Sequence, residues 1–227
     1  MNELDEIHDK GLKMIKTNVW NWDKVESDFW KIPSEEVYYY LYRWKRMNFN
    51  NLLDLGCGLG RHSILFSENG FNVTSYDLSE EGIKILQKEV TDKKLQIKTM
   101  IGDIKELNLR NQEFDCILAF HSIYHVDSED FKKVLKEIYR VLKTDGEMYI
   151  TMLSKSTYSY TAKECKIIDE NVRLKEEEDG TILPHFFVNY EDIKRLLNRF
   201  KIIKTRHIED FFDGKSSWHY FIHAKRE

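Results

Sequence analysis

The chain has 227 residues, of which 41% are hydrophobic, and a formal net charge of −4 at pH 7. This length allows one large domain, or one domain with a cap, around a sizeable core. The acidic balance provides no strong basic field for nucleic acid, and no apolar run is long enough to span a membrane.

The cysteines and the first residues indicate a reduced, cytoplasmic protein. Cys57, Cys116 and Cys165 lie far apart, without the spacing of metal ligands. The acidic start, Met1 to Glu6, lacks the basic and then apolar layout of a signal peptide. We therefore expect no metal and no contact with a membrane.

Residues 1–48 predict a helical and aromatic arm. Apolar residues at roughly helical spacing mark a first helix over Leu4 to Ile15. Pro33, followed by two glutamates, opens a second helix that runs to about Met47. Its apolar side is expected to contain Val37, Tyr38, Leu41, Tyr42 and Trp44. The tryptophans between the two helices either pack against the main domain or cover a ligand cleft.

The main domain, residues 49–227, begins with a strand that ends in a glycine-rich turn. Residues 52–62 have the sequence LLDLGCGLGRH, and a helix follows from about Gly60. Gly56 and Gly58 can adopt backbone angles closed to other residues, and they have no side chain to hold a ligand away. The N-terminus of the helix points N–H groups and its positive dipole end at the turn. Such a turn suits a nucleotide or a carboxylate, although a plain strand-to-helix connection has the same pattern.

Acidic residues follow the next two strands. The strand Phe71–Asp77 ends in an acid about 20 residues after the first glycine, which can accept hydrogen bonds from both ribose hydroxyls. The strand Leu95–Ile101 leads into Gly102-Asp103, which suits an adenine edge. A fourth strand, Phe114–Phe120, ends beside His121. Because ligands bind at the carboxyl ends of strands in open α/β sheets, we expect these groups to lie together.

The remaining pattern predicts the rest of a doubly wound α/β sheet. A helix over Glu129–Leu142 leads through a turn at Gly146 to a fifth strand, Glu147–Leu153. The alternation then stops, and residues 154–189 form a small β insert with a hairpin turn at Asp179-Gly180. A helix and two more strands follow, and the short Asp213-Gly214 turn makes the last strand antiparallel. We therefore expect a mostly parallel, seven-stranded sheet with helices on both faces.

Together these motifs resemble the class I (Rossmann-like) S-adenosylmethionine-dependent methyltransferases. The resemblance rests on DLGCGLG at Asp54–Gly60, YDLS at Tyr76–Ser79, GDI at Gly102–Ile104, FDCILAF at Phe114–Phe120 and LKTDGEMYI at Leu142–Ile150. These motifs follow the family's order and spacing, and the antiparallel last pair of strands extends the likeness to the carboxyl end.

The resemblance implies a binding site for S-adenosylmethionine. In that family the glycine loop holds the methionine part, an acid at the position of Asp77 binds the ribose, and one at Asp103 lies near the adenine. The implied cofactor-binding residues are Asp54, Gly56, Cys57, Gly58, Gly60, Asp77, Leu78, Gly102, Asp103, Ile104 and Phe120. An amino-terminal segment often covers the cofactor in this family, and aromatic faces attract a sulfonium cation. Trp20, Trp30 and Tyr38, in that order, are therefore candidates for a lid.

Two other enzyme classes fit the sequence less well. A nicotinamide dehydrogenase needs the pattern G-x-G-x-x-G, but Arg61 stands at the position of its last glycine. Methyltransferases of nucleobase amino groups carry Asn or Asp and then Pro-Pro after the fourth strand, where this chain has the sequence FHSIY at residues 120–124.

Three side chains after the fourth strand are candidates for catalysis. Methyl transfer from a sulfonium is an in-line displacement, so the enzyme mainly supplies alignment and a dry pocket. A base is needed only when the acceptor must first lose a proton. His121, Tyr124 or His125 could orient or deprotonate an acceptor, although His125 could also pack against the next helix. A metal site built from His121, His125, His185 and His219 lacks a dedicated ligand motif.

The sequence therefore predicts a cytoplasmic enzyme that methylates a small molecule with S-adenosylmethionine as cofactor. No nucleic-acid partner is expected. The alternatives are a protein or RNA acceptor and a non-catalytic protein that binds S-adenosylmethionine. The sequence identifies neither the acceptor atom nor the oligomeric state.

Overall fold

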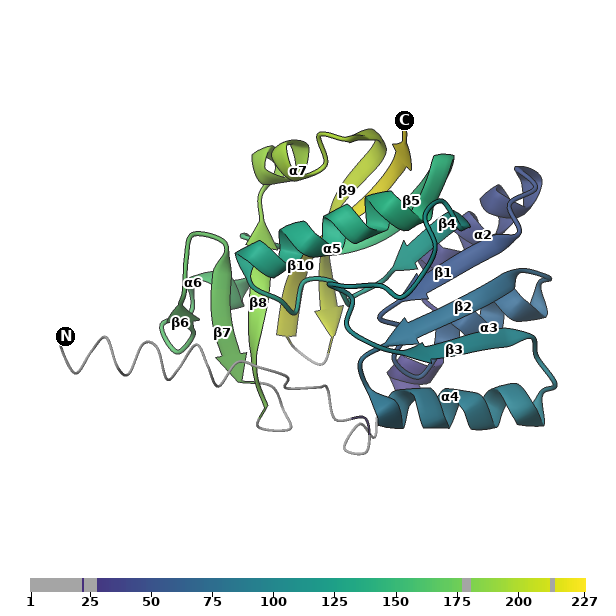
Figure 1. Cartoon of the computed structure of the whole chain (residues 1–227). Helices are drawn as coiled ribbons and strands as arrows, with labels where there is room; N and C mark the ends of the chain where they lie inside the picture. The colour runs from purple at the N-terminus through teal and green to yellow at the C-terminus, as the bar shows by residue number, and fades with distance from the viewer. Residues whose placement is uncertain (1–21, 23–27, 177–180, 213–214) are drawn as a thin grey trace.

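The computed structural model describes residue 22 and residues 28–176, 181–212 and 215–227. Four sequence predictions lie outside these residues: the helix Leu4–Ile15, the position of Trp20, and the turns at Asp179-Gly180 and Asp213-Gly214. Within the described residues, the helices and strands follow the predicted order through the first five strands, with a loop between the third and fourth strands (Figure 1).

The helices are η2 (Asp28–Lys31), α2 (Glu35–Arg46), α3 (Arg61–Glu68), α4 (Glu80–Asp92), α5 (Ser128–Val141), α6 (Tyr158–Thr161) and α7 (Tyr190–Leu196). The strands are β1 (Asn51–Leu55), β2 (Asn72–Asp77), β3 (Ile97–Ile101), β4 (Phe114–Ala119), β5 (Leu142–Ser154), β6 (Lys166–Ile167), β7 (Val172–Glu176), β8 (Ile182–Val188), β9 (Phe200–Phe212) and β10 (Lys215–Arg226).

The strands form one sheet around a mostly parallel centre. Five parallel strands have the order β3-β2-β1-β4-β5, and the last strand, β10, pairs antiparallel with both β5 and β9. These are the seven strands expected from the sequence. The insert adds β8, β7 and β6 to the same sheet, because Leu153 and Ser154 pair in parallel with Phe187 and Val188. The predicted fold class is confirmed, and in the described part of the chain the insert enlarges the sheet to ten strands.

Helices cover both faces of this sheet. Phe131 of α5 and Ile193 of α7 belong to one cluster of buried side chains, and Trp44 of α2 and Phe66 of α3 belong to another. Figure 1 shows α5 lying across one face of the sheet. None of the helices in the described part of the chain is both long and apolar enough to cross a membrane.

The helix α2 packs on the sheet through a stripe of buried side chains that recur every three or four residues. Its buried residues are Val37, Tyr40, Leu41 and Trp44. Tyr40 stacks on Tyr149 of β5 with ring centroids 3.8 Å apart. The expectation that Tyr38 and Tyr42 face the core is wrong, since they are 41% and 66% exposed. Each lies one position beyond a buried residue and so points about 100° away from the stripe.

Side chains cap α4 and α5, and the turn inside β5 differs from the prediction. The side chains of Ser79 and Asp127 cap α4 and α5 by accepting backbone N–H groups. The residue with positive φ is Asp145 (64°), and not Gly146. Gly146 is needed for space, because a Cβ there would lie 2.9 Å from the carbonyl oxygen of Asp115.

Candidate functional site

Backbone hydrogen bonds bring together the carboxyl ends of the first three strands. The N–H of Gly56, after β1, donates to the carbonyl of Tyr76 in β2 over 2.7 Å. The N–H of Gly102, after β3, donates to the carbonyl of Asp77 over 2.9 Å. The three turns that the sequence singled out therefore lie side by side at one edge of the sheet.

The glycine turn has a backbone that other residues rarely adopt. Gly56, Gly58 and Gly60 have φ values of 71°, 54° and 79°. A Cβ at Gly56 would lie 2.3 Å from the Cβ of Ser122, and one at Gly60 would lie 2.3 Å from Cδ1 of Leu86. The glycines thus allow α4 and the loop after β4 to pack closely against the turn.

The carboxylate of Asp77 is fixed against this turn. Its Oδ2 accepts the N–H of Gly58 over 2.7 Å, and its Oδ1 accepts the N–H of Ser79 over 2.8 Å. Burial raises the pKa of Asp77, against the effect of these N–H groups, which lower it. The next side chain, Leu78, is 37% exposed. An acceptor carboxylate and an apolar surface therefore lie next to each other at the end of β2.

Two implied cofactor-binding residues lie beneath the turn. Asp54 is 2% exposed, and its Oδ2 accepts a hydrogen bond from the hydroxyl of Ser63 over 2.6 Å. Burial raises the pKa of Asp54 to about 6. Cys57 is buried in a cluster with Ile83 and Leu86. These two side chains are packed beneath the turn, away from solvent.

The third turn presents a half-exposed carboxylate. Asp103 has 38% side-chain exposure, and its Oδ1 accepts the N–H of Lys105 over 2.9 Å. Its Oδ2 lies 3.2 Å from Nζ of the same lysine. Ile104 packs against the main core. Gly102 makes room for Tyr76, since a Cβ there would lie 2.1 Å from the tyrosine oxygen.

Aromatic residues of the arm lie beside the glycine turn. Trp30 packs over the guanidinium of Arg61, 5.3 Å from its ring centroid, and the same guanidinium lies 5.9 Å from the ring of Phe120. Trp22 meets Trp30 edge to face at 6.0 Å. A Cβ on Gly58 would lie 2.5 Å from the Trp22 ring. The sequence pattern does not distinguish Trp22 from the neighbouring tryptophans, because only its tertiary contacts set it apart.

Arg61 and His62 attach this part of the arm to the first turn of α3. The guanidinium of Arg61 donates to the carbonyl of Ile32, and Nε2 of His62 accepts the N–H of Ser34 over 3.2 Å. Burial lowers the pKa of Arg61 to about 10 and the pKa of His62 well below its ordinary value. The ring of His62 is therefore neutral at neutral pH, as its acceptor role requires.

The loop after β4 contributes His121 and Tyr124 to a cluster of imidazole and phenol groups. His121 has a φ of 53°, and its N–H donates to the hydroxyl of Thr151 over 2.6 Å. Its Nδ1 lies 3.2 Å from the Tyr124 hydroxyl, and its ring meets that of His219 with centroids 4.4 Å apart. Burial, with neighbouring positive groups adding to it, lowers the pKa of His121 well below its ordinary value. The ring is therefore neutral and can donate or accept a hydrogen bond.

The insert closes the other side of this cluster. The rings of His125 and His185 have centroids 4.7 Å apart, and the N–H of Phe186 donates to the carbonyl of Tyr124 over 2.8 Å. Strand β8 thus lies against the loop that carries the three candidate catalytic residues. Across the described residues, no three His, Cys, Asp or Glu side chains are grouped so that they could hold a metal ion.

Sequence reasoning missed Thr151 and could not orient His219. Thr151 is fully buried in β5, where a polar residue within an apolar strand is a usable signal. The orientation of His219 follows from the register of β10 on β5, in which His219 lies opposite Leu153 and Tyr220 lies opposite Met152. Because side chains alternate along a strand, the side chain of His219 lies on the opposite face of the sheet from those of Tyr220 and Met152.

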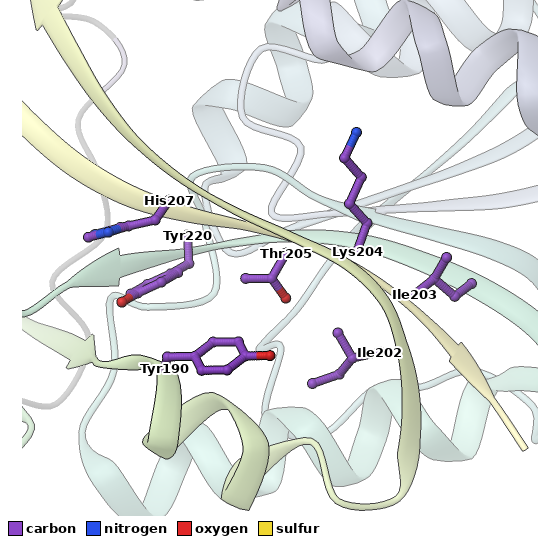
Figure 2. Close-up of a pocket in the computed structure, with 7 residues that line it drawn as sticks. All are labelled: Tyr190, Ile202, Ile203, Lys204, Thr205, His207 and Tyr220. Atoms are coloured by element: carbon purple, nitrogen blue, oxygen red, sulfur yellow. The ribbon is translucent and has the colours of Figure 1, made fainter.

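A separate pocket of about 480 Å³ lies on the α7 face of the sheet. Figure 2 shows Tyr190 of α7 facing Tyr220 and Thr205 of the last two strands. The side chain of Tyr220 belongs to the core under α5 and α7, whereas Phe221 belongs to the core under α2 and α3. This pocket contains none of the predicted site residues.

A family model and known relatives match the chain. Residues 53–150 match the model of a methyltransferase domain. The chain is 27% identical to a glycine/sarcosine N-methyltransferase of Aphanothece halophytica over 94% of its own length and 89% of that protein. It is 33% identical to a ubiquinone biosynthesis O-methyltransferase of Pelagibacter ubique, but over only 48% of this chain and 44% of that one.

Solved structures share the fold. A S-adenosylmethionine-dependent methyltransferase of Methanosarcina mazei matches with a TM-score of 0.70 at 19% identity, covering 86% of this chain and 98% of that one. At this low identity the likeness shows the fold alone.

Proposed function

Because the chain belongs to the class I S-adenosylmethionine-dependent methyltransferase family, we propose that it transfers the methyl group to a small molecule. It is an enzyme of that class, and S-adenosylmethionine is its cofactor. When bound, the cofactor supplies an activated methyl group that an acceptor displaces in line.

We assign the cofactor to the edge formed by the first three strand ends. The residues present fit it, because the turn of positive-φ glycines at the N-terminus of α3 suits the methionine part and the Asp77 carboxylate can accept ribose hydroxyls. Leu78 and Asp103 then lie on the adenine side. Within the arm, the described residue Trp30, which packs over Arg61, would cover this edge.

The acceptor would lie in the cluster that follows β4. The observation that supports this is a set of imidazole and phenol groups enclosed by the loop after β4, the end of β10 and the insert 154–189. Neutral His121 can orient an acceptor or take up its proton, Tyr124 can orient the acceptor by a hydrogen bond, and the packed rings exclude water. A narrow, enclosed cluster favours a small acceptor over a protein or RNA chain.

The names of the relatives agree with a small acceptor. One methylates glycine or sarcosine, and another acts in ubiquinone biosynthesis. We also propose a cytoplasmic location without a nucleic-acid partner, in keeping with a net charge of −4 and three free cysteines.

The test is an assay for the demethylated cofactor with a panel of amino acids, phenols and quinols, followed by mass analysis of the acceptors. We expect at least one small acceptor to gain a methyl group. His121→Phe should lower kcat about a hundredfold and leave cofactor affinity unchanged. His207→Phe, on the other face of the sheet, is the control. Methyl label that enters only protein or RNA from a cell extract would contradict a small acceptor. Cofactor binding with no transfer to any acceptor would favour the non-catalytic alternative.

A further inference from the structure

The ring of Trp22 lies between the glycine turn and the first turn of α4. A Cβ on Gly58 would lie 2.5 Å from its Cζ2, and a Cβ on Gly82 would lie 3.0 Å from its Cδ1 and 3.1 Å from its Nε1. The ring is therefore in van der Waals contact with the backbone of both elements.

These two elements also hold the carboxylate of Asp77. Gly58 and Ser79 donate their N–H groups to its two oxygens, and the Ser79 hydroxyl accepts the N–H of Gly82. Trp22 thus spans the turn and the helix that surround this carboxylate. Its other side meets Trp30, which packs over Arg61.

Gly82 has no conformational reason to be glycine. It lies inside α4 with an ordinary helical backbone, where alanine is the more favourable residue. The space around it supplies the reason, since a Cβ would press on the Trp22 ring and lie 3.1 Å from the carbonyl oxygen of Gly58. A bare backbone at this position lets the indole reach the glycine turn.

We propose that Gly82 is a positioning residue that holds the Trp22 indole against the turn beside Asp77, so that the indole packs on the bound cofactor. The proposal rests on the cofactor position assigned above. Gly82 acts through Trp22, because it has no side chain of its own to offer a ligand.

The test compares the affinity of S-adenosylhomocysteine for four variants by calorimetry. Gly82→Ala and Trp22→Ala should each raise Kd about tenfold. The double variant should bind no more weakly than Trp22→Ala, because both changes remove the same contact. Lys84→Ala, an exposed substitution on the same helix, is the matched control and should bind like the wild type.

Two further readouts separate positioning from a structural defect. The free Gly82→Ala protein should keep a Tm close to that of the wild type, because the helix propensity of alanine offsets the close contact with the Gly58 carbonyl, while its affinity for the cofactor falls. Trp22→Phe should remove part of the fluorescence change that accompanies binding in the wild type. Wild-type affinity of Gly82→Ala, tighter binding by either single variant, or additive losses in the double variant would overturn the proposal.

The control Asp77→Ala distinguishes this proposal from the one before it. If Asp77→Ala weakens binding and the Gly82 and Trp22 variants do not, the assigned cofactor position holds and the role of Gly82 is refuted. If Asp77→Ala binds like the wild type, the cofactor position itself is refuted, and the role of Gly82 with it.

Discussion

Gly56 meets two separate requirements, one of backbone conformation and one of space. Its φ is 71°, and a Cβ would lie 2.3 Å from the Cβ of Ser122. Gly70 has a φ of 91° but nothing within 4 Å of its position for a Cβ. Substitution at Gly70 therefore tests backbone strain alone, whereas substitution at Gly56 tests strain and steric overlap together.

We expect Gly70→Ala to cost about 1–2 kcal/mol of unfolding free energy from backbone strain alone. Gly56→Ala should cost about 2–5 kcal/mol, because the overlap with Ser122 adds to the strain, and it should also lose cofactor affinity. Denaturant unfolding and calorimetric titration measure the two effects. Equal costs at both positions would mean that the loop after β4 does not press on the turn.

Residues that act through local chemistry could be predicted from the sequence. The glycine turn and Asp77 are recognisable because the turn geometry and the spacing to the acid are short-range properties. Trp22 and Gly82 were not predicted, because their contact joins residues 60 positions apart through packing. Asp54 was predicted as a cofactor-binding residue, but its burial under the turn and its hydrogen bond from Ser63 of the next helix were not predicted, because both depend on tertiary packing.

At the scale of elements, Glu147 ties α2 to the centre of the sheet. This carboxylate is 1% exposed and accepts hydrogen bonds from Arg43, from the Trp44 indole over 2.9 Å, and from His223 of β10. Burial opposes its charge, but the bonds from Arg43 and His223 prevail and lower the pKa of Glu147 to about 2. The charged form therefore stabilises the fold above the ordinary pKa of 4.5, and this contribution is lost as the pH falls towards 2.

We expect Glu147→Gln to lower the unfolding free energy by about 3–5 kcal/mol at neutral pH, because it leaves buried donors without their anion. Glu129→Gln is the control, since Glu129 pairs with Lys132 at the surface with 76% side-chain exposure and should change stability by less than about 1 kcal/mol. Chemical denaturation of both variants checks this. A similar small loss at both positions would show that the Glu147 contacts are not needed.

Elements with strong periodicity were predicted best. The helix α5 and the strands β1 to β4 lie close to their predicted ranges, because a long amphipathic stripe or an apolar run specifies each of them. The helix α2 was predicted, but its predicted buried face wrongly included Tyr38 and Tyr42, which are exposed. The strand β6 was not predicted, because its two residues are exposed and have no periodic pattern.

At the scale of the whole molecule, buried neutral histidines make stability depend on pH. Burial lowers the pKa of both His62 and His121 well below 6.5. Below that pH the unfolded chain binds more protons than the folded protein, so the unfolding free energy falls as the pH is lowered through 6.5. Asp54 acts in the opposite direction between about 6 and 3.8, because its pKa is raised on folding.

We expect His62→Gln to lose less Tm than the wild type when the pH is lowered from about 7.5 to about 5.5. Glutamine can still accept the N–H of Ser34 but does not titrate. Thermal unfolding of the wild type and of His62→Gln at both pH values gives the comparison. The same pH slope in the wild type and in His62→Gln would contradict a buried neutral ring at this position.

The central claim is that S-adenosylmethionine binds across the glycine turn with its ribose on Asp77. Calorimetric titration with S-adenosylmethionine and its demethylated product, with NAD as the control ligand, tests it most directly in the wild type and in Asp77→Ala. We expect both sulfur ligands to bind the wild type. In the variant, loss of the charge-assisted hydrogen bonds to the ribose should weaken the binding of both sulfur ligands by about 1.5–3 kcal/mol, which is about ten- to a hundredfold in affinity. Equal affinity in both proteins, or a preference for NAD, would contradict the assignment.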